Sequence, residues 1–172
     1  MNATILLQGY LTTNKLQEAQ REMAFYRKIY GNDSSKPNLS LVIASEGGVA
    51  ISALAFSDDM TSLFSTTAKI YRAESAAALI ALSAEKREMV RNGIFTISLG
   101  TAEVDSGTLV TPEKVPEQII EQARLFRKKV FEKLEHSGFP KTGLLMNKLL
   151  TQNQLTLTAE ECLHLGIVER II

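Results

Sequence analysis

The chain has 172 residues, of which 45% are hydrophobic and 22% are charged, and this is the size and composition of one globular domain. Lys plus Arg and Asp plus Glu number 19 each, so no overall field favours nucleic acid or an anionic membrane as a partner. Cys162 is the single cysteine, which excludes an internal disulfide. The chain has only two histidines, and they are well separated in the sequence. We therefore expect neither a metal site nor another cofactor.

The N-terminal sequence MNATILLQGY lacks a positively charged region and carries only a short apolar run. No stretch of the chain approaches the roughly 18 consecutive apolar residues that a membrane-spanning helix needs. We therefore expect neither a secretion signal nor a membrane span, and a reducing cytoplasmic location fits the lone cysteine.

The first half of the chain alternates short apolar runs with segments of helical periodicity. Residues 3–9 predict a strand, and residues 13–30 predict a helix that ends before the breaker cluster GNDSSKPN. The run LSLVIA at 39–44 is short, apolar and rich in β-branched residues, as expected of a strand buried on both faces. A helix is predicted to follow at 49–60.

The second half repeats this alternation and adds one long helix. The predicted elements are a strand at 65–71, an alanine-rich helix at 75–84, a strand at 94–99, an amphipathic helix at 111–136 and a last helix starting near Thr158, followed by residues 167–172. Repeated βα units predict right-handed crossovers and a mainly parallel sheet, with binding sites where strands end and helices begin.

Two of the predicted strand-to-helix turns carry residues suited to chemistry, namely Ser-Glu-Gly-Gly at 45–48 and Arg-Ala-Glu-Ser-Ala-Ala-Ala at 72–78. Glycines let a backbone approach a substrate closely, and N–H groups at a helix start can hold a developing oxyanion. Each turn also has an ordinary structural interpretation. A Gly-Gly pair is often only a turn, and a serine before an alanine-rich helix is often its N-cap.

Together with their flanking blocks, these turns resemble the proteolytic subunit of the Clp protease, within the wider crotonase-like superfamily, over nearly the whole chain. The similar blocks are ILLQGYL, LSLVIASEGGVAISALAFSDDM, RAESAAALIAL, the Lys-Arg pair before IFTIS, His-Ser-Gly after the long helix and LTAEECLHLGIVERII. The resemblance implies one α/β domain over 1–172, built as a spiral of repeated ββα-type units with a mainly parallel sheet and a long handle helix.

The resemblance also implies a site. Ser75 falls on the nucleophile position, while Gly47, Gly48 and Ala76 fall on positions that bind the oxyanion and the substrate. The family histidine falls on Ser98, whose hydroxyl cannot act as a general base near neutral pH as an imidazole can.

The family aspartate falls on or beside Gln154, so both partners of the nucleophile are lost. Two further departures add negative charge near Ser75, because Glu46 replaces the family proline and Glu74 replaces a small residue. A carboxylate there would repel an oxyanion, or Glu74 could instead pair with Arg72.

A substitute base would have to come from elsewhere. Lys69 and Lys114 are candidates for a serine-lysine arrangement, although a solvated lysine is the more common state. His136 is better suited to capping the end of the long helix, and His164 to facing solvent or packing in the last helix.

Three functions are compatible with this pattern. The first is an inactive or strongly impaired Clp-type subunit in a homomeric or mixed ring. A Clp ATPase is a possible partner of this ring, and the long helix could hold two rings together. The second is a serine peptidase that cleaves extended peptides with an unconventional base. The third is a crotonase-like binder of an acyl thioester or another carbonyl ligand.

Overall fold

The structure is a computed structural model, and it describes residues 2–30, 36–99 and 117–172. The described strands are β1 (Asn2–Leu11), β2 (Asn38–Gly48), β3 (Ser65–Glu74), β4 (Lys86–Ser98), β5 (Gln154–Leu157) and β6 (Arg170–Ile171). The described helices are α1 (Thr13–Tyr30), α2 (Ala50–Leu63), α3 (Ala76–Ser83), α4 (Glu117–His136), α5 (Leu144–Gln152) and α6 (Ala159–His164).

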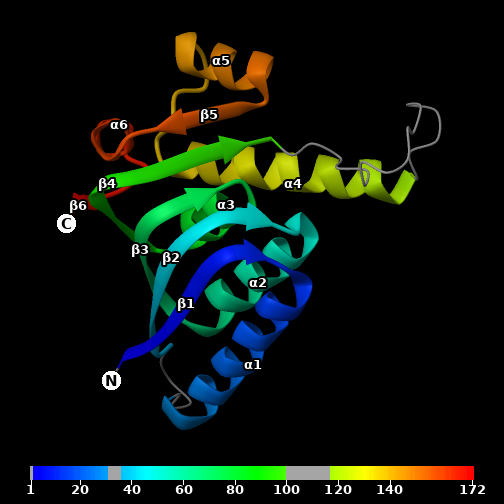
Figure 1. Cartoon of the computed structure of the whole chain (residues 1–172), viewed down its shortest axis with the longest axis vertical. Helices are drawn as coiled ribbons and strands as arrows, with labels where there is room; N and C mark the ends of the chain where they lie inside the picture. The colour runs from blue at the N-terminus through cyan, green and yellow to red at the C-terminus, as the bar shows by residue number, and fades with distance from the viewer. Residues whose placement is uncertain (1, 31–35, 100–116) are drawn as a thin grey trace.

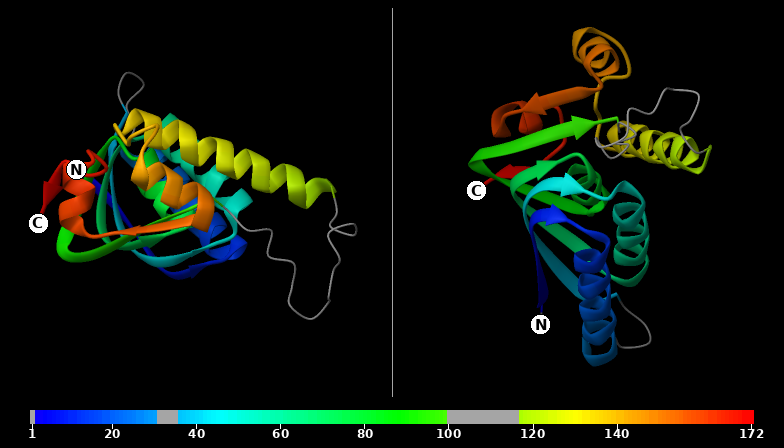
Figure 2. Two further views of the ribbon diagram at one scale, coloured as in Figure 1. Left: turned by 90° about the horizontal axis from the view of Figure 1, so that it is seen from above. Right: turned by 45° about the vertical axis from the view of Figure 1, so that its right-hand side comes forward.

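The six strands form one sheet in the order β1-β2-β3-β4-β5, and β6 pairs with β4 off this path (Figure 1). The first four strands are parallel to one another, while β5 runs antiparallel to β4. An α/β fold with a mostly parallel sheet is therefore confirmed. Helices α1, α2 and α3 lie along the same face of the sheet (Figure 2).

Burial along β2 follows the pleat of the strand. Leu39, Leu41 and Ile43 are at most 1% exposed, whereas the alternating residues Val42 and Ala44 are partly exposed. The expectation that this strand is buried on both faces was wrong. Its physical reason is that the described helices α1, α2 and α3 all lie on one face of the sheet, which leaves the alternating β2 residues of the other face without a helix over them.

Helix α4 packs on the rest of the chain with its C-terminal half. Phe126, Val130 and Leu134 are buried, whereas Ile120 and Leu125 are 37% and 43% exposed. The N-terminal half extends beyond the sheet (Figures 1 and 2). The predicted start of this helix at 111–116 lies outside the described residues.

Helix α5 and strand β5 were not predicted, and no strand was assigned within residues 167–172, where β6 lies. Helix α5 follows Gly143, and β5 follows Asn153, whose left-handed backbone ends the helix. Both are short, and an antiparallel strand does not fit a chain of βα units. Strand β4 also begins earlier than predicted. Its first half was missed because it contains the exposed polar residues Arg91 and Asn92, which do not look like part of an apolar strand.

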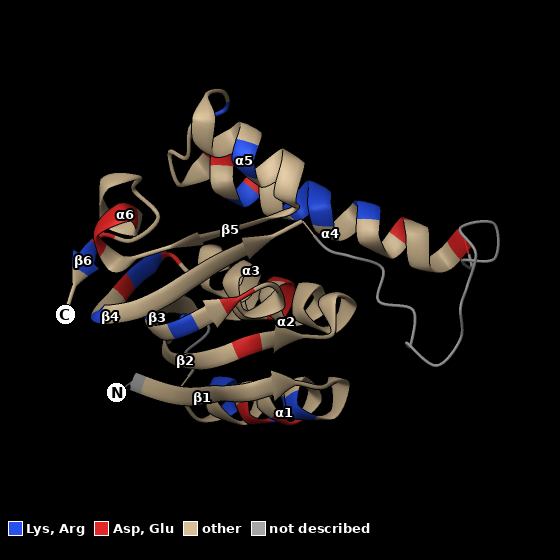
Figure 3. Ribbon diagram, turned by 45° about the horizontal axis from the view of Figure 1, so that its top comes forward, with Lys and Arg blue, Asp and Glu red and all other residues tan. Residues whose placement is uncertain are grey.

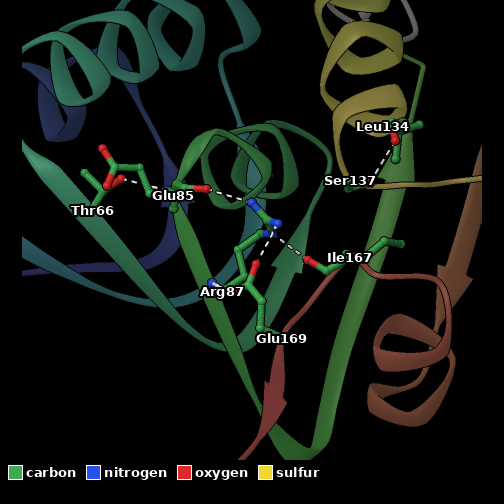
Figure 4. A network of polar contacts seen from close by, with 8 residues as sticks. Thr66, Glu85, Arg87, Leu134, Ser137, Ile167 and Glu169 are labelled. Atoms are coloured by element: carbon green, nitrogen blue, oxygen red, sulfur yellow. Dashed lines mark hydrogen bonds and ion pairs between the residues drawn. The ribbon is translucent and has the colours of Figure 1, made fainter.

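Arg87, at the start of β4, ties the C-terminal segment to the sheet (Figure 4). Its guanidinium donates to the carbonyls of Ile167 at 2.5 Å and Ala84 at 2.7 Å, and to Glu169 Oε1 at 2.8 Å. Its backbone N–H donates to the second Glu169 oxygen at 2.5 Å. The bonds to Ile167 and Glu169 join residues 80 and 82 positions apart along the chain.

Positions of Lys and Arg and of Asp and Glu are spread over the ribbon (Figure 3), and the two groups number 19 each. None of the described helices combines the length and the apolar composition that crossing a membrane would demand. Within residues 2–30, 36–99 and 117–172, no three His, Cys, Asp or Glu side chains gather as a metal site would need.

Candidate active site

Ser75 forms a strained turn between β3 and α3. Its backbone angles are φ 49° and ψ −113°, outside the regions that a side chain with a Cβ prefers. Such a conformation costs about 1–3 kcal/mol and persists only when the surrounding structure imposes it. Here the Ser75 N–H donates to Thr96 O at 2.9 Å, and the Ser75 carbonyl accepts the Leu79 N–H at 3.1 Å.

The Ser75 side chain does not cap the helix that it precedes. Ser75 occupies the N-cap position of α3, but its hydroxyl makes no capping hydrogen bond. Across the described parts of the chain, no other hydrogen bond engages this hydroxyl either. The interpretation of Ser75 as an ordinary N-cap is therefore wrong, and this partly exposed residue lines a cavity.

The cavity has a volume of about 520 Å³ and brings together residues from most of the chain. It lies beside the carboxyl ends of the central parallel strands, where a fold of this type places its ligands. Its lining residues are Tyr10, Glu46, Gly48, Val49, Ala50, Glu74, Ser75, Thr96, Ser98, Ile119, Gln122, Ala123, Phe126 and Gln154.

The three positions expected to correspond to a catalytic triad all line this cavity. Ser75, Ser98 and Gln154 come from β3–α3, β4 and β5 respectively. Ser98 and Gln154 are direct partners in the antiparallel pairing of β4 with β5. Side chains at such paired positions have Cβ atoms roughly 5 Å apart, so the two can contact each other.

The Gly-Gly turn is required by close chain packing. A Cβ on Gly47 would lie 2.7 Å from Glu74 O and 3.0 Å from Ser75 Cβ, so only glycine lets β2 approach the strained serine. A Cβ on Gly48 would lie 2.1 Å from Leu11 O at the end of β1. Both glycines also have positive φ, which disfavours any side chain.

These contacts narrow the choice of oxyanion donors. The Gly47 N–H already donates to the buried hydroxyl of Ser45 at 3.0 Å, so it is not free to hold a second acceptor. Ala76 begins α3, and its N–H has no acceptor within the helix. Of the predicted donors, the Ala76 N–H is the one that these contacts support, since Gly48 is paired with Leu11 in the β1–β2 ladder.

The charge at the cavity is acidic. Glu46 and Glu74 line it, and no described lining residue is Lys, Arg or His. Arg72 Nε donates to Glu74 Oε1, which confirms the predicted pairing of these two side chains. This hydrogen bond raises the pKa of Arg72, and the charges of Glu74 and, to a smaller extent, Glu46 act in the same direction.

None of the described candidate bases lines the cavity. His136 Nδ1 lies 2.5 Å from Glu132 O at the end of α4, as expected of a helix cap, and His164 is exposed on α6. Lys69 is exposed on β3, six residues before Ser75, which is roughly 20 Å along an extended strand. Lys114 lies outside the described residues.

Several lining residues were not anticipated from the sequence. Thr96 was detectable in principle, because it precedes Ser98 by two positions and so shares its face of β4. Ile119, Gln122 and Phe126 were not detectable, since only the packing of α4 brings them to the cavity.

No family model matches this chain, and no curated protein matches it.

Proposed function

We propose that this protein is a serine-peptidase-like scaffold that has lost its proton-transfer partners and acts as an inactive or strongly impaired subunit of a Clp-protease-like assembly. The observation that carries this proposal is the strained backbone of Ser75, with its hydroxyl unpaired at a cavity that Ser98 and Gln154 also line. A strained strand-to-helix turn is one established way to present a serine nucleophile, as in the α/β-hydrolases.

The loss of activity follows from proton transfer. A serine hydroxyl attacks a carbonyl only when a base accepts its proton, and neither Ser98 nor Gln154 has a nitrogen of suitable basicity. An enzyme without its triad retains only roughly 10³–10⁴-fold acceleration over water, from binding and from oxyanion stabilisation. That residual rate is too slow for protein turnover, so binding without efficient cleavage is the activity that this site supports.

A restoration experiment tests the proposal directly. In the double variant S98H/Q154D, the new imidazole and carboxylate would occupy paired positions next to Ser75. We expect the unchanged chain to resist a fluorophosphonate probe and the double variant to be labelled at least about tenfold faster.

The triple variant S75A/S98H/Q154D is the matched control, and it should not be labelled. Rapid labelling of the unchanged chain at Ser75, or cleavage of a peptide that S75A abolishes, would contradict the inactive state. Equal labelling of the double and triple variants would show that the probe reacts away from Ser75.

A second candidate is a slow serine hydrolase, and the retained strain at Ser75 favours it. A protein that no longer uses Ser75 in a reaction gains nothing from a backbone conformation that costs about 1–3 kcal/mol. Apart from Tyr10, the titratable groups that line the cavity are Glu46 and Glu74, and Arg72 already engages Glu74. Glu46 would then accept the proton, so E46Q should abolish any labelling of Ser75 that the unchanged chain displays.

Assembly is the second half of the proposal. Ile120 and Leu125 on the projecting half of α4 are exposed, as is Tyr71 at 50% on the uncovered sheet face. Apolar side chains left open on a parallel sheet and on a projecting helix support contacts with further subunits. Sedimentation of the chain should reveal an oligomer that L125E weakens, and a strictly monomeric chain would remove the ring from the proposal.

A further inference from the structure

A second groove follows the outer side of β1, away from the Ser75 cavity. It has a volume of about 520 Å³. Its lining residues are Ile5, Leu6, Leu7, Gln8, Gly9 and Leu11 of β1 with Lys15, Glu18, Ala19 and Glu22 of α1. Consecutive β1 residues line it and no β2 residue does, so the groove runs along the unpaired side of the strand.

Strand β1 has little of the protection that natural edge strands carry. It lies at the end of the strand order and, in the described part of the chain, pairs with β2 alone. Its ten residues, NATILLQGYL, include no charged residue and no proline, and Leu6 is 59% exposed. Exposed, apolar and uncharged edges are the ones to which another extended chain readily adds.

One side chain partly guards this edge. The Lys15 ammonium donates to the Gln8 carbonyl at 3.2 Å, and so covers a single acceptor near the end of the groove. The backbone from Ile5 to Leu7 has no such cover from a described side chain. Over Ile5–Gly9 the open edge is roughly 17 Å long, enough to pair with a short extended segment.

The helix side of the groove carries two carboxylates, Glu18 and Glu22, and one ammonium, that of Lys15. Glu18 and Glu22 both line it, and neither belongs to an ion pair within the described residues. Glu22 accepts a hydrogen bond from the Tyr26 hydroxyl at 2.8 Å, which raises the pKa of Tyr26 and leaves the carboxylate charge uncompensated. An incoming strand would therefore meet two unpaired negative charges beside α1.

We propose that the outer edge of β1 and the facing side of α1 form a docking site for an extended, basic segment of a partner protein, which adds to the sheet as a further strand. Side chains of an added strand alternate between its two faces. Those directed toward α1 would be Lys or Arg and would pair with Glu18 and Glu22. Those directed to the other face would be apolar and would pack beside Leu6.

A probe peptide tests this site in the full chain. The probe is a fluorescent peptide of alternating lysine and valine, about as long as β1, and binding is followed by fluorescence anisotropy. We expect saturable binding that the variant E18Q/E22Q weakens about fivefold, because two surface charge pairs are lost. The matched control E121Q/E160Q removes two exposed carboxylates elsewhere and should bind as the unchanged chain does.

Strand addition is separated from mere charge attraction by a second peptide. N-methylation of alternate residues on the bonding edge keeps every charge but removes the N–H donors, so it should weaken binding at least tenfold. No binding of the first peptide, or equal binding of the methylated one, would overturn the proposal. So would a dimer that L6K converts to a monomer, since a second copy would then occupy the edge. Neither Glu18 nor Glu22 lines the Ser75 cavity, so a loss of binding in E18Q/E22Q is independent of the proposed peptidase-like site.

Discussion

The two ends of helix α3 differ in how completely their polar groups are satisfied. At the N-terminal end, Ser75 has a strained backbone, an unpaired hydroxyl and two carboxylates nearby. At the C-terminal end, Arg87 donates to the Ala84 carbonyl, and the Glu85 N–H donates to Thr66 Oγ1 at 3.0 Å (Figure 4). The helix between them is buried along its whole length.

This difference separates stability from function within one element. A polar network whose members all have partners stabilises the fold, and the Arg87 cluster is of this kind. Strain and unpaired groups lower stability, so they persist where binding or chemistry uses them. We therefore interpret the Arg87 end as the anchor of the domain and the Ser75 end as its working site.

The largest effect should come from closing the space at the working end. G48A would force a Cβ to within 2.1 Å of Leu11 O at φ +157°, and we expect it to lower the free energy of unfolding by about 3–5 kcal/mol. G143A is the matched control, because Gly143 has φ +99° but no neighbour within 4 Å. It should cost only about 1 kcal/mol in urea unfolding. Equal losses of stability in G48A and G143A would show that the positive φ, and not the contact with Leu11 O, causes the destabilisation.

Removal of the anchor should have the next largest effect. R87M keeps much of the side-chain length but deprives the Ile167 and Ala84 carbonyls of their donor, and we expect a loss of about 3 kcal/mol. R170A removes an ion pair in which the arginine is 65% and Glu88 18% exposed, and it should cost less than about 1 kcal/mol. A small effect of R87M in thermal or urea unfolding would contradict the role of this cluster as an anchor.

A glycine at Ser75 should stabilise the protein. Because glycine tolerates positive φ, S75G releases the strain and should raise the free energy of unfolding by about 1 kcal/mol. S75A retains a Cβ and removes no described hydrogen bond, so it should change stability by less than about 0.5 kcal/mol. A loss of about 1 kcal/mol in S75A would instead indicate that the hydroxyl caps the helix after all.

The smallest effect concerns Cys162, which lies near the anchor and contrasts with the accessible Ser75. Burial raises the pKa of the Cys162 thiol to about 12, while the thiol of an unfolded chain ionises near ~8.5. The folded state thus favours the protonated thiol, and this contribution is complete below pH ~8 and is lost as the pH rises toward 12.

We expect a loss of just under about 1 kcal/mol between pH 7 and pH 9. The variant C162V should lack this part of the pH dependence in urea unfolding. A native thiol that reacts with iodoacetamide at pH 8 as fast as the unfolded chain does would show that Cys162 is accessible.

Much of the fold was predictable because local pattern and tertiary environment agree. The helix at 13–30 has the predicted bounds, since its apolar positions follow the 3.6-residue period and breakers follow it. The strand at 39–44 was predicted correctly, but the prediction that both of its faces are buried was wrong. Sequence periodicity cannot tell how many faces of a sheet the helices cover. Helix α5 and strand β5 were missed because short elements carry little periodic signal.

The candidate site was predictable only as a set of positions. Family resemblance drew attention to Ser75, Ser98 and Gln154, and the structure brings all three to one cavity. Their functional roles remain predictions until the restoration experiment is done. The wall that α4 contributes depends on contacts that no local pattern encodes, whereas the Arg72–Glu74 pair joins residues two positions apart and was predicted from the sequence.

The sequence by itself determined the alternation of strands and helices, the neutral charge and the absence of an imidazole at position 98, because these depend on residue identity and local spacing alone. Only the tertiary structure decided the strained backbone of Ser75, the pairing of Ser98 with Gln154 and the open edge of β1. Each of these arises where chain segments distant in sequence pack together, and packing of that kind is decided by the whole domain.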